Sequence, residues 1–281
     1  MNYIFVQLGY IPNYLKYSIN SIKKIDSKAQ IHLITDKSFK DNEITIHNVS
    51  DFESQDIKYL KNLKYFDDWN LNPLWETSLL RIFYISNLIK KNNLKENIHF
   101  DSDVIVLQPF ENIKNYFDKE KFNVTPIKNN EFVFGYSFVN EAKIIEVVCD
   151  ELIKIYENAD RFSKRYFSGK KLTEMKSLYI ASLNYPTLIN PLPVLPSENP
   201  IVFDPASYGQ YLYGTHNNKF SKGFIDETHI VSDLLASKNL KFTLNSEKSG
   251  LSVNENFYNF ANLHIHSKKL KKVYKKLITT N

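Results

Sequence analysis

The sequence predicts an α/β protein whose mostly parallel sheet is covered by helices on both faces. Three observations lead to this class. Strand-like and helix-like patterns alternate through the first hundred residues. The first strand-like segment is a short apolar run, as expected of a buried strand. Polar or glycine positions follow directly where these segments end, as ligand-binding edges require.

The first elements follow from local apolar patterns. Residues 3–8 are an apolar run closed by a glycine and a proline, and they predict a buried first strand. Residues 11–24 carry apolar side chains at helical spacing. Residues 30–35 (QIHLIT) predict a second strand, and residues 45–49 predict a weaker third one. This order requires crossovers between parallel strands.

The next segment holds the clearest helix and the most informative strand. Residues 74–91 have the best helical pattern, residues 97–100 predict a strand, and residues 104–107 continue it after Asp101-Ser102-Asp103. Gly9, Asp36 and Asp101 each follow a predicted strand. Because ligands bind beyond the carboxyl ends of parallel strands, these positions are expected to share one cleft.

The second half predicts a lobe that packs on the sheet. The expected elements are strands at 122–125 and 132–139, a helix at 141–157, helical structure over 160–183 interrupted by Gly169, an extended proline-rich stretch at 186–205, a helix at 227–237, and strands at 240–244 and 261–265. We expect one domain over residues 1–281, divided into 1–120, 121–270 and a basic tail at 267–281.

Composition excludes several classes of protein. The 281 residues are 43% hydrophobic and 24% charged, which excludes wholesale disorder. The single cysteine, Cys149, excludes an intrachain disulfide framework. No apolar run reaches the roughly 18–20 residues that span a bilayer, and the N-terminus lacks signal-peptide features. We therefore expect a cytoplasmic protein.

The net charge of +5 comes largely from lysines of the last fifteen residues. Outside this tail acids and bases nearly balance, so no nucleic-acid partner is expected. The tail is either a solvated helix face or a contact with phosphate or an anionic membrane, which would make the protein membrane-peripheral.

Asp101 and Asp103 flank a small residue between two apolar runs. Two carboxylates at the end of a buried strand are costly unless a cation or hydrogen-bond donors neutralise them. A divalent ion, Mn²⁺ or Mg²⁺, is favoured over simple capping of loop amides. In an extended chain the two side chains share a face but need a local bend, or a bridging water, to reach one ion.

One enzyme class with this pattern fits poorly. Haloacid-dehalogenase-type phosphatases place Asp-x-Asp after an apolar strand, and Asp101 would then be the nucleophile. That family begins near this motif, whereas about a hundred residues precede it here, and no later Gly-Asp with a further aspartate completes a magnesium site. The phosphatase remains an alternative.

Four blocks together resemble GT-A-fold glycosyltransferases, most closely the family 8 and family 32 type. They are residues 75–81 (WETSLLR), 99–106 (HFDSDVIV), 203–211 (FDPASYGQY) and 262–268 (NLHIHSK). The third block is similar to one in uncharacterised bacterial and viral transferases. The glycine and Lys-Pro-Trp that follow the histidine in family 8 are absent.

The resemblance implies transfer of a sugar from a nucleotide-diphosphate donor, such as a UDP- or GDP-sugar, to a hydroxyl of a glycan or polysaccharide acceptor. Asp101 and Asp103 are expected to hold the metal, with Asp103 the stronger candidate for a direct ligand. His264 or His266 would add a nitrogen ligand, and Lys268 would contact phosphate. The pattern leaves the choice between the histidines open.

The resemblance also implies a nucleotide-sugar-binding half at 1–120 and an acceptor half at 121–270. Residues assigned to the donor side are Gln7, Gly9, Thr35, Asp36, Thr77, Arg81 and Ser102, with Tyr14, Trp69 and Trp75 as candidates for stacking. Core packing is the commoner fate of aromatic side chains. Arg81 is expected to reach the nucleotide or to organise the aspartates, and an ordinary salt bridge on the helix surface is the alternative.

For the acceptor side the polar candidates are Asp204, Gln210, Asp226 and Glu227. An inverting enzyme needs a carboxylate base on the acceptor hydroxyl, and Asp226 or Glu227 would serve. Family 8 and 32 enzymes are retaining, so retention is the expectation. Asp226 is equally well placed to cap the helix expected after it. A nucleotide-sugar-binding module without turnover is the remaining alternative.

Overall fold

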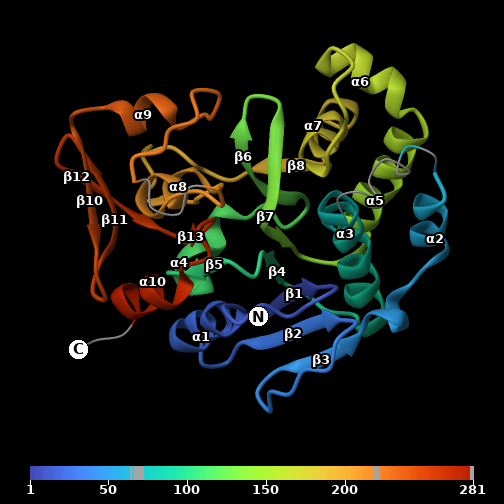
Figure 1. The fold of residues 1–281 in the computed structure, drawn as a ribbon, viewed down its shortest axis with the longest axis horizontal. Coiled ribbons are helices and arrows are strands. Elements are labelled where there is room, and N and C mark those ends of the chain that lie inside the picture. Colours follow the sequence, from blue (N-terminus) through green and yellow to red (C-terminus); the bar gives the residue numbers. More distant parts are fainter. Residues whose placement is uncertain (64, 66–72, 218–221, 279–281) are drawn as a thin grey trace.

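The computed structural model describes residues 1–63, 65, 73–217 and 222–278, and it confirms the predicted α/β class. A seven-stranded sheet has the order β3-β2-β1-β4-β7-β6-β8 (Figure 1). Its strands are β1 (Asn2–Gln7), β2 (Gln30–Thr35), β3 (Thr45–Asn48), β4 (Asn97–Phe100), β6 (Phe122–Lys128), β7 (Glu131–Val139) and β8 (Ile189–Pro191). Only β7 runs antiparallel to its neighbours, so the sheet is mostly parallel.

Side chains alternate between the two faces of the sheet, and both faces are buried against helices. On one face Tyr3 and Phe5 pack with the apolar stripe of α1 (Leu15–Ile25) and with α4 (Phe110–Ile113). On the other face Ile4 packs in a second cluster. The helices of that cluster are α2 (Gln55–Lys61), α3 (Pro73–Asn92), α5 (Ala142–Glu157), α6 (Ala159–Phe167) and α7 (Glu174–Asn184). The period-2 strands and period-3.6 helices thus form the predicted layers.

The C-terminal part adds two small sheets beside the large one. β5 (Val104–Val106) pairs with β13 (Asn262–His264), and a further sheet has the order β10-β11-β12-β9. Its strands are β9 (Ile201–Val202), β10 (Leu240–Leu244), β11 (Ser249–Val253) and β12 (Asn256–Phe260). The helices of this lobe are α8 (Ser207–Tyr213), α9 (Ser232–Ala236) and α10 (Leu270–Leu277), and a third apolar cluster joins them.

The helical stretch at 160–183 is interrupted at Gly169 as predicted, because Ser168 (φ 51°) and Gly169 (φ 80°) adopt left-handed conformations that end α6. Several other elements differ from the predictions. The helix expected at 227–237 is confined to α9, since turns occupy residues 227–231. The sequence patterns did not predict α2, α8, β11 or β12, so the second lobe is more regular than expected.

Within the described ranges, no helix combines the length and the hydropathy that crossing a membrane requires.

Candidate functional site

A tight turn between β4 and β5 brings the two aspartates together. The Val104 amide donates to the Asp101 carbonyl at 3.1 Å, and the Asp101 amide donates to the Gly135 carbonyl on β7 at 3.1 Å. The turn supplies the bend that an extended chain lacks. Both carboxylates therefore face the same space at the carboxyl end of β4.

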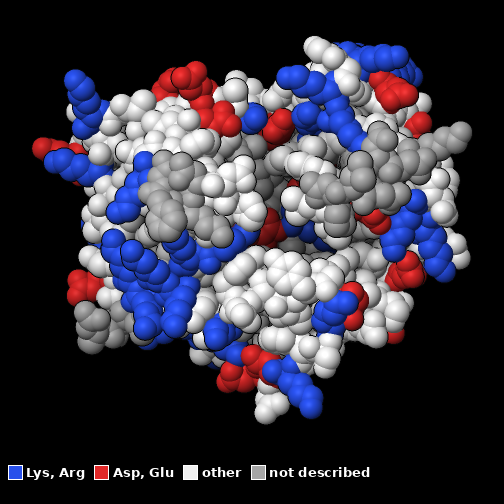
Figure 2. Space-filling model, viewed as in Figure 1, with Lys and Arg blue, Asp and Glu red and all other residues white. Residues whose placement is uncertain are grey.

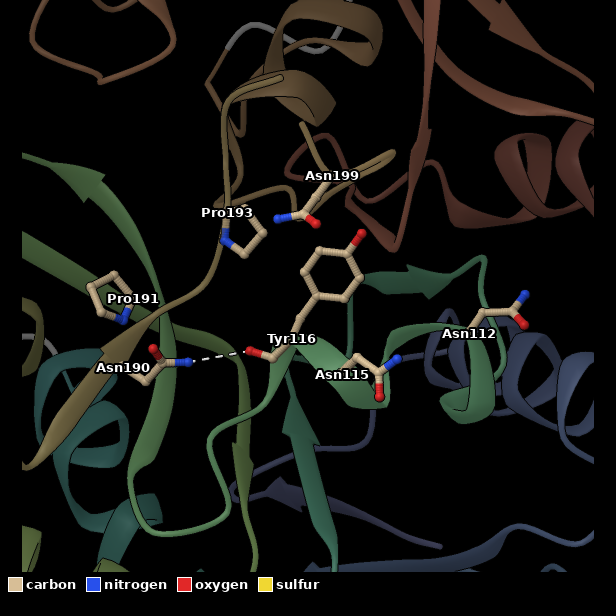
Figure 3. Close-up of a pocket in the computed structure, with 7 residues that line it drawn as sticks. All are labelled: Asn112, Asn115, Tyr116, Asn190, Pro191, Pro193 and Asn199. Atoms are coloured by element: carbon tan, nitrogen blue, oxygen red, sulfur yellow. Dashed lines mark hydrogen bonds between the residues drawn. The ribbon is translucent and has the colours of Figure 1, made fainter. Parts of the chain in front are cut away.

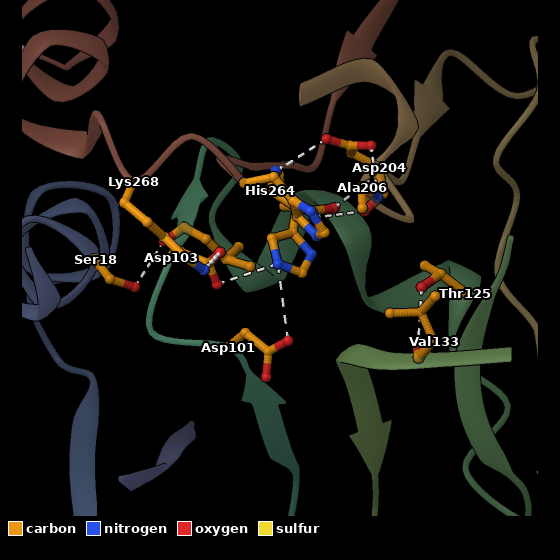
Figure 4. A network of polar contacts seen from close by, with 12 residues as sticks. Ser18, Asp101, Asp103, Thr125, Val133, Asp204, Ala206, His264 and Lys268 are labelled. Atoms are coloured by element: carbon orange, nitrogen blue, oxygen red, sulfur yellow. Dashed lines mark hydrogen bonds and ion pairs between the residues drawn. The ribbon is translucent and has the colours of Figure 1, made fainter. Parts of the chain in front are cut away.

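His264 reaches this turn through strand pairing. β13 pairs antiparallel with β5, with His264 opposite Val104, and the Ile265 amide donates to the Asp103 carbonyl at 2.8 Å. This places His264 Nε2 at 3.1 Å from Asp103 Oδ1 and at 3.8 Å from Asp101 Oδ2 (Figure 4). The metal group predicted at this edge is thus assembled from segments about 160 residues apart in sequence.

Asp101, Asp103 and His264, here called the Asp–Asp–His cluster, each offer a ligand atom, and these atoms lie within 4.8 Å of one another. Asp103 and His264 are 3% and 5% exposed. His266 is not in this group: β13 ends at His264, and His266 Nδ1 instead lies 3.2 Å from Gln210 Nε2. The geometry therefore selects His264 from the two histidines.

Two cations flank the cluster, and each takes only one oxygen of its aspartate. Arg81 Nη1 binds Asp101 Oδ1, and Lys268 Nζ binds Asp103 Oδ2. The other oxygen of each carboxylate is the one nearest His264. The two cations therefore neutralise the charge of the carboxylates. The oxygens that face the imidazole take no part in these ion pairs, so the space between the two carboxylates stays open.

The charges of the cluster depend on one another. Burial alone would raise the pKa of Asp101, but Arg81 and His264 outweigh it, and the pKa lies below its ordinary value. Burial is likewise outweighed at Asp103, where His264 and Lys268 lower the pKa. Burial would lower the pKa of His264, whereas the carboxylate of Asp103 raises it above the ordinary value. The cluster thus favours two ionised carboxylates, and a metal ion would compete with the proton that Asp103 favours on His264.

The donor set fits a divalent ion. Two carboxylate oxygens and one imidazole nitrogen are ligands that Mn²⁺ accepts, and Mg²⁺ also favours the oxygens. Ligands bound at right angles to one ion, at about 2.1 Å each, lie about 3 Å apart. The separation of 3.1 Å between His264 Nε2 and Asp103 Oδ1 is already close to that value.

The ends of β1 and β2 also meet as predicted. The Gly9 amide donates to Asp36 Oδ1 at 2.9 Å, with Gly9 at φ 81°, a conformation that favours glycine. Asp36 is exposed and Gln7 half-buried, so both are accessible from solvent. Thr35 is buried, and its hydroxyl accepts from the Lys37 amide at 3.1 Å, which is a local structural role.

The remaining donor-side candidates surround the cluster less closely. Ser102 is half-buried in the turn between the aspartates. Thr77 Oγ1 donates to the Leu74 carbonyl at 3.0 Å in the first turn of α3. The ring of Tyr14 lies 5.6 Å from Lys268 Nζ. Trp75 packs against the apolar core, and Trp69 lies outside the described residues.

Asp204 has a structural position. Its Oδ1 accepts from the amides of Ala206 and Tyr208, and its Oδ2 accepts from those of Gly209 and His264, all at 2.9–3.0 Å. The carboxylate thereby caps α8 and holds β13 against it. These bonds occupy both oxygens, so Asp204 fixes the backbone of His264 and has no oxygen left for an acceptor.

The other acceptor-side candidates are placed differently. Asp226 Oδ1 accepts from the amide and hydroxyl of Thr228 at 2.9 and 2.7 Å, and its Oδ2 lies 3.3 Å from His229 Nε2. Asp226 therefore organises the turn before α9. Glu227 is exposed in that turn. Gln210 is 8% exposed, and its Nε2 lies 3.2 Å from Nδ1 of His266, two residues beyond His264.

Two residues of the site were not predicted. Glu174, 4% exposed, holds Arg81 Nη2 at 3.3 Å, and 93 residues separate them, so no local pattern signals the pair. Gly135 faces the cluster: a Cβ there would lie 3.0 Å from His264 Cε1 and 3.1 Å from Asp101 Oδ2. A glycine inside a predicted strand was an available signal of such a close approach.

The molecular surface is hollowed near the centre of the face shown in Figure 2, with acidic and basic side chains at the floor. To its lower left the same face carries a cluster of basic side chains over α10.

No protein-family model matches this sequence, and no curated protein matches it. Its structure resembles solved glycosyltransferases at low identity. The galactosyltransferase LgtC, solved with donor and acceptor sugar analogs, is 9% identical, with 100% of this chain and 98% of that chain covered and a TM-score of 0.46.

Two further solved structures are similar. GlyE from Streptococcus pneumoniae TIGR4 is 12% identical, with 67% of this chain covered and a TM-score of 0.44. The alignment spans 44% of GlyE, less than half of its length. Mouse xyloside xylosyltransferase 1 is 10% identical, with 72% and 86% of the two chains covered and a TM-score of 0.41.

Proposed function

We propose that this chain is a metal-dependent glycosyltransferase of the GT-A type. It moves a sugar from a nucleotide-diphosphate donor, a UDP- or GDP-sugar, to a hydroxyl of a glycan or polysaccharide acceptor. The observation that carries the proposal is the Asp–Asp–His cluster at the carboxyl end of β4, with Lys268 and Arg81 beside it. Carboxyl ends of parallel strands are where such sheets bind ligands.

The chemistry of the donor explains why these groups are gathered. When the bond between sugar and phosphate breaks, the nucleoside diphosphate leaves with additional negative charge. A divalent ion held by Asp101, Asp103 and His264 would stabilise that charge. Lys268 is 31% exposed at its side chain and is paired with Asp103. Its ammonium is placed to turn from the aspartate to a phosphate oxygen.

Arg81 has a positioning role in this proposal. Its guanidinium bridges Asp101 and Glu174 and stacks 5.2 Å from the ring of Phe134. A planar group with two carboxylate partners and an aromatic support has little freedom to move. It therefore fixes which oxygen of Asp101 faces the metal ligands.

Two of the three carboxylates considered as an inverting base are already engaged, which favours a retaining reaction; Glu227, exposed in the turn before α9, is the carboxylate that is left. The carboxylate oxygens of Asp204 are occupied by four backbone amides, and those of Asp226 by Thr228 and His229. Neither side chain therefore offers a free base to an acceptor hydroxyl. Gln210, joined to His266 beside the cluster, is the polar acceptor-side group that remains close to the reacting centre.

The phosphatase alternative is less well supported. Its first aspartate, Asp101, would need an oxygen free for nucleophilic attack, whereas one oxygen binds Arg81 and the other faces His264. The proposed transferase metal site uses a histidine from β13, whereas the phosphatase pattern contains no such histidine.

The test is a screen of UDP- and GDP-sugars with Mn²⁺ or Mg²⁺, with release of nucleoside diphosphate as the readout. Release should stop when a chelator removes the ion and return when the ion is added back. Undiminished release in chelator would contradict the metal role. Phosphate release from p-nitrophenyl phosphate would favour the phosphatase, and donor-dependent thermal stabilisation without turnover would favour a binding module.

We also propose a cytoplasmic protein, built as a single domain, that contacts anionic membrane through its basic tail. On α10 the apolar residues Leu270, Val273 and Leu277 are buried against the core, while Lys271 and Lys272 are exposed. The buried face explains why the lysines form one outward cluster. Co-sedimentation with vesicles containing phosphatidylserine, absent with neutral vesicles, is the expected result.

A further inference from the structure

A polar pocket of about 510 Å³ lies apart from the Asp–Asp–His cluster. Two segments line it, and we call it the asparagine pocket. Its lining residues are Asn112, Asn115, Tyr116, Asn190, Pro191, Pro193 and Asn199 (Figure 3). The first three follow β5, and the other four come from β8 and the proline-rich stretch after it. None belongs to the candidate site described above.

The strand registers give the separation from the cluster. Asn190 on β8 pairs with Asn123 on β6, which pairs with Phe138 on β7, which pairs with Ile98 on β4. Three strand spacings therefore lie between Asn190 and Ile98, and Asp101 is three residues beyond Ile98. At about 4.8 Å per spacing and 3.3 Å per residue, Asn190 is roughly 15–20 Å from Asp101. A molecule of the size of one sugar held at Asn190 would therefore not reach the carboxylate of Asp101.

The lining has an unusual chemistry. Each asparagine amide both donates and accepts hydrogen bonds, and the lining contains no charged side chain. The side-chain amides of Asn115 and Asn199 form no hydrogen bond with another residue in the described part of the chain. One aromatic ring, that of Tyr116, and two prolines supply the apolar part. This set matches a ligand that is neutral, rich in hydroxyls and apolar on one face.

A sugar ring has those properties. Vicinal hydroxyls can each accept and donate, as an amide does, while the C–H bonds of one face pack against an aromatic ring. A phosphate or carboxylate ligand would leave its charge without a counter-charge in this lining. We infer that the asparagine pocket binds a neutral sugar unit of a glycan, as a second carbohydrate site separate from the metal centre.

Two side chains of the lining are held in place. Asn190 Nδ2 donates to the Tyr116 carbonyl at 3.2 Å, which joins the two lining segments (Figure 3). It also donates to Asn123 Oδ1 at 2.7 Å in the sheet. The ring of Tyr116 packs edge to face on Phe203, with centroids 5.9 Å apart. Because these contacts hold Asn190 and Tyr116 without a ligand, these two side chains lose little entropy when a ligand binds.

The inference is tested by binding, and it does not require the transfer reaction. The full chain is screened against immobilised neutral and acidic oligosaccharides, and the Kd of the best neutral one is measured by titration. The variant N115A/N199A removes two exposed amides and should raise that Kd at least about tenfold, with the melting temperature unchanged. The matched control N42A, at an exposed asparagine before β3, should leave the Kd unchanged.

Two further measurements separate this inference from the proposed function. D103N, at the metal cluster, should bind the neutral oligosaccharide as the unmodified chain does, even though it loses donor turnover. Binding that survives N115A/N199A, no binding to any neutral oligosaccharide, or equal binding to acidic ones would each overturn the inference. If the chain turns over no donor but binds the neutral oligosaccharide, and only N115A/N199A loses that binding, the asparagine pocket is supported and the proposed transferase activity is contradicted.

Discussion

Asp103→Asn tests the metal site most directly, because it removes a charge and keeps the shape. Without metal its cost should be modest. Lys268 is 31% exposed at its side chain and can return to water, whereas the side chain of Asp103 is only 4% exposed, so the pair is partly buried. The asparagine keeps the shape of the side chain and can still accept a hydrogen bond, but it loses the charge that faces Lys268 and His264. We expect a net loss of about 2 kcal/mol, or roughly 4–8 °C in melting temperature for a chain of this size.

With metal and nucleotide the difference should be much larger. At ligand concentrations of about 100 times Kd, binding stabilises the folded state by about 2.7 kcal/mol. This corresponds to a rise of roughly 5–10 °C in the unmodified chain. The assay is thermal unfolding with and without Mn²⁺ plus UDP or GDP, and D103N should show no rise.

D41N is the matched control for this experiment. Asp41 is also paired with a lysine, Lys23, at 3.5 Å, and it lies away from the cluster. It should keep the full rise in melting temperature. A rise retained in D103N would refute the metal role of Asp103, and a collapse of its unfolding temperature without ligand by well over 10 °C would show that the aspartate is structural.

Two other predictions concern a steric contact and pH. G135A should weaken Mn²⁺ affinity about 10- to 100-fold, because the new methyl would lie 3.0 Å from His264 Cε1; unchanged affinity in a Mn²⁺ titration would contradict this. Burial and then His47 lower the pKa of His32 from 6.5 to about 4. The unfolded chain therefore binds the proton first as pH falls below 6.5, and stability drops. At pH 5 we expect the free energy of unfolding to fall by on the order of 1 kcal/mol, as measured by denaturant unfolding. The fall should be smaller in H32Q. An unfolding midpoint that does not change with pH would contradict the prediction.

Predictions that depend on neighbouring residues were accurate. Strands β2 and β4 have the expected bounds, and the acidic pair follows β4 as predicted. α8 was missed because its sequence, SYGQYLY, has a central glycine and follows a proline-rich stretch. Its first amides are held by Asp204, so a buried carboxylate supplies the stabilisation that helix propensity does not.

The role of Asp204 also could not be read from the sequence. An aspartate in a polar stretch suits a catalytic base as well as a cap. Only the packing of α8 against β13 shows that the carboxylate oxygens of Asp204 accept hydrogen bonds from backbone amides, including the amide of His264.

The sequence by itself determined the α/β order and the position of two carboxylates at a strand end, because apolar periodicity and strand ends are local properties. The tertiary structure decided which histidine joins them, since this depends on the register of β13 against β5. It also decided the partners of Asp103 and Arg81, which lie 165 and 93 residues away at Lys268 and Glu174. Contacts between segments so distant are set by packing of the whole chain, and no local pattern contains them.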